Sequence, residues 1–134
     1  MIRAVDSSII IDVLEPDPEH GPGSWEALRR CLREGSMVAC DVVWAEVATA
    51  FGHAQARAIE ALREMGIAYS AMSEEAALRA ADCWYRFRKR SEGKGRIVAD
   101  FLVGGHALVQ ADRLLTRDRG FYRDYFKPLK LIVP

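Results

Sequence analysis

The chain has 134 residues, of which 50% are hydrophobic and 28% are charged, and its formal net charge at neutral pH is zero. This length fits one domain, and the balanced charge excludes a whole-molecule field that would attract nucleic acid, although a local basic patch is compatible with it. No signal peptide or apolar run of the ~20 residues that span a membrane is visible. The three cysteines form no CxxC pair, so we expect free thiols and a cytoplasmic protein.

The N-terminal half alternates short apolar runs with amphipathic segments. The apolar runs predict strands at 2–6, 37–40 and 67–69. The segments between them predict helices at 9–14, 24–34, 42–51 and 53–65. Residues 15–23 contain prolines and glycines in close succession and predict a loop.

The C-terminal half predicts two longer helices, at 73–90 and 97–111, and strands at 113–116 and 130–133. Gly104 and Gly105 each cost about 1 kcal/mol relative to alanine in a helix interior, so we expect their helix to pack closely against a sheet. Strands that alternate with helices indicate βαβ units. The sequence therefore predicts a single α/β domain over residues 1–134, with a parallel sheet of about five strands flanked by helices.

Four acids follow strands or lie on apolar helix faces: Asp6, Glu46, Asp100 and Asp118. Two of them directly follow strands, where open α/β sheets bind their ligands. The other two have mostly apolar neighbours on their helices, and a carboxylate beside buried surface needs a partner. Alternatives stay open, since Asp6 could cap the next helix and Glu46 could lie on a solvated face. Asp12 and Asp82 are interpreted as helix-surface acids.

The chemistry of these four acids favours a divalent metal. We expect them to converge without a Lys or Arg partner, so that they repel one another and raise their pKa values. Carboxylate-rich sites suit Mg²⁺ or Mn²⁺, whereas the histidines and cysteines lack the spacing of a zinc site. His106 is expected to be a core or supporting residue. A metal in an acidic pocket activates water and offsets charge at a phosphoryl centre, so phosphodiester hydrolysis is the predicted reaction.

Basic residues surround the predicted acidic centre and are candidates for contacts with RNA phosphates. They are Arg88, Lys89, Arg90, Lys94, Arg96, Arg117 and Arg119. The alternative for the run before residue 97 is a solvated helix end, because positive side chains in a last turn also suit the helix dipole.

These acids also resemble the pattern of a known family. Asp6-Ser7-Ser8 resembles the opening DxS signature of PIN-domain nucleases. Glu46, Asp100 and the run Thr116-Arg117-Asp118 match the second, third and fourth acids of that family in order and spacing, across essentially the whole chain. At this size the chain is most similar to the VapC toxins of bacterial and archaeal toxin–antitoxin pairs.

The resemblance implies an Mg²⁺- or Mn²⁺-dependent endoribonuclease that forms homodimers and is neutralised by a VapB-type antitoxin. It implies that Asp6 and Asp100 are the principal metal ligands and that Glu46 and Asp118 complete the site. Ser7 and Thr116 would orient a ligand or a water molecule.

Two other functions remain to be weighed. One is a catalytically silent PIN-like module that binds RNA or a protein. The other is a phosphorelay receiver, which needs a lysine after a late strand beside paired N-terminal acids. Asp6-Ser7 and Thr116-Arg117 supply neither of these features.

Overall fold

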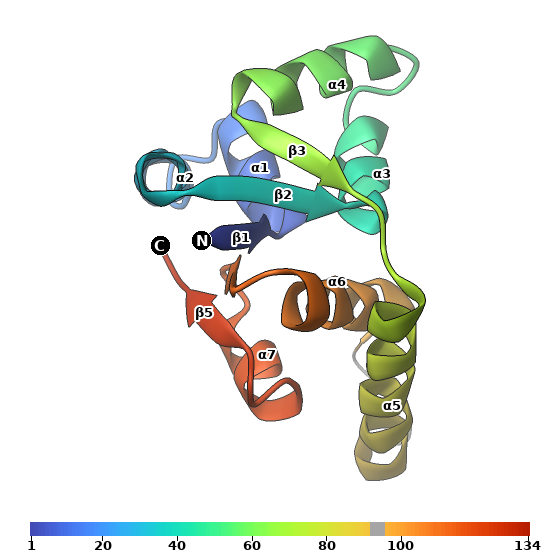
Figure 1. Cartoon of the computed structure of the whole chain (residues 1–134). Coiled ribbons are helices and arrows are strands. Elements are labelled where there is room, and N and C mark those ends of the chain that lie inside the picture. The colour runs from blue at the N-terminus through green and yellow to red at the C-terminus, as the bar shows by residue number, and fades with distance from the viewer. Residues whose placement is uncertain (92–95) are drawn as a thin grey trace.

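A parallel sheet forms the centre of the molecule, and the computed structural model describes residues 1–91 and 96–134. Within these ranges the strands are β1 (Ile2–Val5), β2 (Ser36–Cys40), β3 (Ile67–Ser70), β4 (Arg113–Leu115) and β5 (Lys130–Ile132). All of them pair in parallel, in the order β3-β2-β1-β4-β5 (Figure 1). The prediction of a five-stranded parallel sheet is confirmed.

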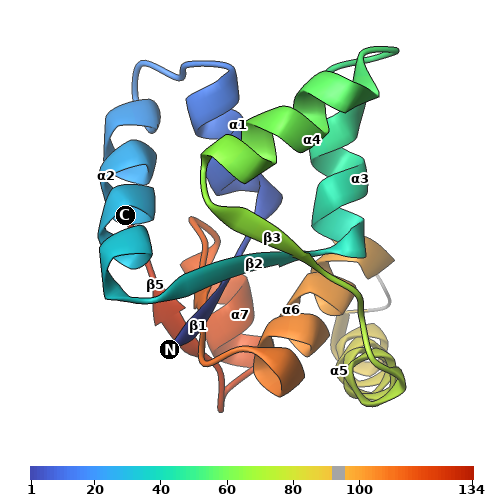
Figure 2. The same cartoon turned by 45° about the horizontal axis from the view of Figure 1, so that its top comes forward.

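The helices cover both faces of this sheet. They are α1 (Ser7–Leu14), α2 (Gly21–Glu34), α3 (Asp41–Thr49), α4 (Gln55–Glu64), α5 (Glu74–Ser91), α6 (Val98–Gln110) and α7 (Arg119–Tyr125). Helices α1, α3 and α4 lie on one face, and α5, α6 and α7 lie on the other, as the turned view of Figure 2 also shows. In the part of the chain that the structure describes, no helix has the length and apolar character needed to cross a membrane.

Two helices differ from the sequence-based expectations. Helix α2 begins at Gly21, inside the segment predicted to be a loop, because Pro22 fits a first helical turn, where its missing N–H costs nothing. Helix α7 was not predicted, because it is short and its buried face consists of only Phe121 and Tyr122.

The two glycines of α6 allow a close approach, but not to the sheet. A Cβ on Gly105 would lie 2.5 Å from the Ala76 carbonyl oxygen of α5, and a Cβ on Gly104 would lie 2.5 Å from the Phe126 ring. Helix α6 does lie against β1 and β4 of the sheet, but its glycines serve a contact other than the expected one, with α5 and with an aromatic side chain. This contact fixes the helix that carries Asp100.

Candidate functional site

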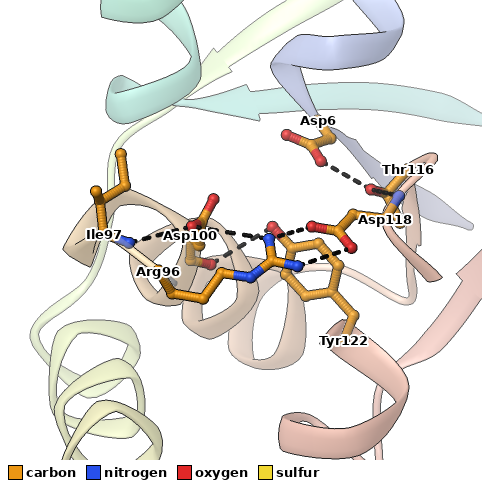
Figure 3. A network of polar contacts seen from close by, with 7 residues as sticks. All are labelled: Asp6, Arg96, Ile97, Asp100, Thr116, Asp118 and Tyr122. Atoms are coloured by element: carbon orange, nitrogen blue, oxygen red, sulfur yellow. Dashed lines mark hydrogen bonds and ion pairs between the residues drawn. The ribbon is translucent and has the colours of Figure 1, made fainter. Parts of the chain in front are cut away.

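Asp6 lies at the carboxyl end of the central strand β1, directly after Val5. It occupies the residue before α1 with extended backbone angles, yet its side chain makes no capping hydrogen bond. Its Oδ2 instead accepts a hydrogen bond from the Thr116 hydroxyl at 2.7 Å (Figure 3). The alternative that Asp6 only caps a helix is thereby set aside.

Thr116 connects two of the predicted acids. It is buried at the end of β4, the strand beside β1. Its hydroxyl donates to Asp6 and accepts a hydrogen bond from the Asp118 backbone N–H at 3.0 Å. Because β1 and β4 are parallel neighbours, Asp6 and Asp118 reach the same edge of the sheet.

Glu46 and Asp100 approach this edge from helices. Glu46 lies half-buried in α3, where the Ser7 side chain lowers its pKa against the effect of burial. Asp100 lies in the first turn of α6, where its Oδ2 accepts a hydrogen bond from the Ile97 N–H at 3.4 Å. The Tyr122 hydroxyl donates to the Asp100 carbonyl oxygen at 3.4 Å and so joins α7 to α6.

The electrostatics of the site are those of crowded carboxylates. Burial raises the pKa of Asp6, and the charges of Asp100 and Asp118 raise it further, against the hydrogen bond from Thr116. Burial also raises the pKa of Glu46, and the charges of Asp6 and Asp100 add to this effect. These couplings place all four acids within electrostatic reach of a common region.

A basic partner lies within this group, contrary to the expectation from the sequence. The Arg96 guanidinium donates to both carboxylate oxygens of Asp118, with Nη2 3.2 Å from Oδ1, and its Nη1 lies 3.9 Å from Asp100 Oδ2 (Figure 3). The hydrogen bonds with Asp118 raise the pKa of Arg96, so it keeps its charge. The prediction that the acids lack a basic partner is wrong for Asp118 and Asp100.

The four carboxylates are the kind of ligand that a hard divalent cation prefers, but their side chains do not converge on one point. All four groups are carboxylates, and across residues 1–91 and 96–134 neither Asp6 nor Glu46 has a cationic partner. In those same ranges, however, no three acidic, histidine or cysteine side chains stand close enough to hold a metal ion as they lie. Proteins hold Mg²⁺ through one or two carboxylates together with water, so two of these acids would suffice as protein ligands.

Sequence reasoning missed a second ion pair beside the site. Arg117 Nε and Nη2 donate to the two oxygens of Asp12 at 2.7 and 3.0 Å, and the Ser24 hydroxyl donates to the same carboxylate at 2.7 Å. Asp12 is only 5% exposed, so its interpretation as a surface acid is wrong. The pair ties the loop that carries Thr116 and Asp118 to α1, and no local pattern shows a contact between residues so far apart in the chain.

The predicted basic residues occupy different environments. Arg88 lies over the ring of Trp84, which is half-buried against Phe101, at 5.6 Å, and Lys89 lies over the exposed Tyr85 ring at 5.4 Å. Arg90 and Arg119 are exposed, whereas Arg96 and Arg117 hold carboxylates. Lys94 lies outside the described residues.

His106 and the cysteines take no part in the site. His106 is buried in α6, with Nε2 2.9 Å from the Ser70 hydroxyl, and burial lowers its pKa. The prediction that it is a core residue is confirmed. All three cysteines are buried free thiols.

Comparison with known proteins agrees with the fold described above. The profile of the family described as "PIN domain" matches residues 3–127. Among curated proteins, no sequence matches significantly. Solved structures do match, and three examples with low sequence identity cover nearly the whole chain.

The first example is VapBC2 from Rickettsia felis bound to a DNA fragment from their promoter, with TM-score 0.73 and 16% identity over 99% of this chain and 98% of that one. The second is VapBC-1 from nontypeable Haemophilus influenzae, with TM-score 0.74 and 22% identity over 99% and 98%. The third is FitAcB from Neisseria gonorrhoeae, with TM-score 0.65 and 21% identity over 98% and 96%.

Proposed function

The chain belongs to the PIN-domain family, and we propose that it is an Mg²⁺- or Mn²⁺-dependent endoribonuclease that acts as the toxin of a toxin–antitoxin pair. The observation that carries this proposal is the meeting of Asp6, Glu46, Asp100 and Asp118 at the carboxyl edge of the central strands. Carboxylates that crowd in this way destabilise the fold unless they serve a ligand.

The residues at the site have two proposed roles, as metal ligands and as groups that hold those ligands in position. A bound Mg²⁺ or Mn²⁺ ion supplies an activated water and offsets the charge of the scissile phosphate. Asp6 and Asp100 are the proposed principal ligands, and Glu46 and Asp118 complete the set. Thr116 holds Asp6 through its hydroxyl group, and Ser7 is the proposed supporting residue beside Glu46.

RNA would be held beside the acids by exposed cations. Arg88 and Lys89 present positive charge on α5 beside the exposed ring of Tyr85, whereas the Trp84 ring under Arg88 packs against Phe101. Cations bind the phosphates of a single strand, and aromatic rings stack on its bases. Arg90 and Arg119 are exposed and extend this surface, whereas Arg96 and Arg117 act in the ion pairs described above.

The proposed partner is a small antitoxin of the VapB type. Support comes from the solved relatives, whose names describe VapBC and FitAcB assemblies. We further propose a homodimer located in the cytoplasm, a compartment that suits three free thiols. A silent PIN-like module is the second candidate function, and the Arg96 ion pairs favour it because they occupy two of the acids.

The nuclease proposal is tested with purified protein and 5′-labelled RNA, in EDTA and in Mn²⁺ or Mg²⁺. We expect cleavage only with metal, and its loss in Asp6→Asn and Asp100→Asn, because each removes one charge from the metal ligands. Asp82→Asn is the matched control, since Asp82 lies on the surface of α5 with its side chain 66% exposed. Cleavage in EDTA that survives Asp6→Asn would refute the metal mechanism. RNA binding without cleavage under every metal condition would indicate the silent module.

A further inference from the structure

Arg96 points into the acidic site instead of toward solvent (Figure 3). We propose that Arg96 is an internal counter-ion that holds the site closed in the metal-free protein and that must withdraw before a divalent cation binds. This inference rests on the proposed metal site and adds a residue that controls access to it.

The contacts of Arg96 show that its position is a specific one. Its two terminal nitrogens donate to the two oxygens of Asp118, which is the bidentate geometry that a guanidinium favours. Its Cζ lies 4.3 Å from the centre of the buried Phe121 ring, so the ring supports one face of the group. The side chain is only 29% exposed.

Arg96 and a metal ion would compete for the same oxygens. Both oxygens of Asp118 serve the guanidinium, and the oxygen of Asp100 nearest to it is the one that also accepts the Ile97 N–H. A divalent cation binding these two acids would meet a positive charge at contact distance. This competition would keep Asp118 and Asp100 from a cation for as long as the guanidinium stays in place.

Release of Arg96 does not require the fold to open. Arg96 precedes Ile97, the residue before α6, so it makes none of the hydrogen bonds within that helix. The acids that remain without a cation, Asp6 and Glu46, provide the negative field that draws the metal in. As the metal takes Asp118 and Asp100, rotation of the Arg96 side chain suffices to free them.

The test is Mn²⁺ binding, followed by the electron paramagnetic resonance signal of free Mn²⁺. Arg96→Gln should bind Mn²⁺ at least tenfold more tightly than wild type, and its melting temperature without metal should fall. The Mn²⁺ affinity of Arg96→Lys should lie between those of wild type and Arg96→Gln, because lysine keeps the charge but cannot make the bidentate contact of a guanidinium. Arg57→Gln is the matched control: Arg57 is exposed on α4 and its side chain has no partner in the described part of the chain. Its Mn²⁺ affinity should change less than threefold.

A second measurement uses the wild-type protein and does not depend on how a variant folds. The Nε–Hε signal of Arg96 in ¹H–¹⁵N spectra should move on titration with Mg²⁺, with the same midpoint as the protein's metal binding. An Arg96→Gln affinity for Mn²⁺ equal to or weaker than that of wild type, or an Arg96 signal that ignores Mg²⁺, would overturn the inference while leaving the nuclease proposal standing. No Mn²⁺ binding by wild type or by Arg96→Gln would overturn both.

Discussion

At the scale of one residue, Asp6 is a carboxylate whose charge destabilises the folded protein. Burial and the charges of Asp100 and Asp118 raise its pKa, and among the described residues no cation pairs with Asp6 itself. Asp6→Asn keeps an oxygen that accepts the Thr116 hydrogen bond but removes the charge. We expect the variant to melt at or above the wild-type temperature in EDTA, measured by circular dichroism.

Bound metal should reverse the order of the two melting temperatures, so that wild type melts above Asp6→Asn. An ion that binds only the folded protein stabilises it by about 2.7 kcal/mol at a hundredfold excess over Kd. For a domain of this size that is a rise of roughly 10 °C, which Asp6→Asn should largely lose and Asp82→Asn should retain. An Asp6→Asn protein that responds to Mn²⁺ as wild type does would show that Asp6 is not a ligand.

The four acids could be recognised from the sequence, but their partners could not. Each acid follows a strand or interrupts an apolar helix face, and these are local patterns. Arg96 lies 22 residues from Asp118, and Arg117 lies 105 residues from Asp12, so only the folded chain shows these ion pairs. A run of basic residues likewise does not show which arginines are exposed and which form ion pairs with buried or half-buried acids.

At the scale of elements, the contact between α5 and α6 depends on one missing side chain. Gly105→Ala would place a Cβ 2.5 Å from the Ala76 carbonyl oxygen and 2.9 Å from Ala80 Cβ, neither of which is a flexible side-chain end. We expect a loss of about 1–3 kcal/mol in the free energy of unfolding, measured with urea.

Gly120→Ala in α7 is the matched control. A Cβ there meets no atom within 4 Å among the described residues, so alanine should be neutral or should stabilise the helix by up to about 1 kcal/mol. Equal effects of the two substitutions would show that α6 does not need its close approach to α5.

Substitutions on helix α5 can test the proposed RNA binding without changing the proposed metal site. Replacing Arg88, Lys89 and Arg90 with serine should weaken RNA binding and flatten its salt dependence. The log–log slope should fall by about 0.7 for each lost contact with a single-stranded phosphate, measured by fluorescence anisotropy. Mn²⁺ affinity should stay unchanged.

The matched control for α5 removes three cations from the opposite side of the sheet. Arg29, Arg30 and Arg33 of α2 are exposed, and their replacement with serine makes the same change in net charge. An unchanged slope in the α5 variant would mean that its charges are only solvated.

At the scale of the whole molecule, the number and parallel direction of the five strands follow from alternating apolar runs and helices, whereas their order is seen only in the structure. Helix α7 and the start of α2 were missed because packing and proline geometry decide them, not periodicity. The sheet brings the ends of β1 and β4 together, and that arrangement builds the site.

The toxin proposal also belongs to the whole molecule. Expression of the chain alone should arrest the growth of a bacterial host, and co-expression with the adjacent small reading frame should restore it. Growth is followed by optical density, with Asp6→Asn as the inactive control. A folded, active nuclease that leaves growth unchanged would refute the toxin role and not the ribonuclease activity.

The hydrogen bond between Thr116 and Asp6 joins residues 110 positions apart. A ribosome that adds about 5–20 residues per second therefore needs on the order of 5 to 20 s between them. During synthesis β1 cannot pair with β4 until β4 has been translated. Asp6 therefore has neither Thr116 nor Asp118 beside it until nearly the whole chain has been made. For the proposed toxin, the order of the strands would thus delay activity until translation is almost finished, and the proposed antitoxin could be made before the first active molecule appears.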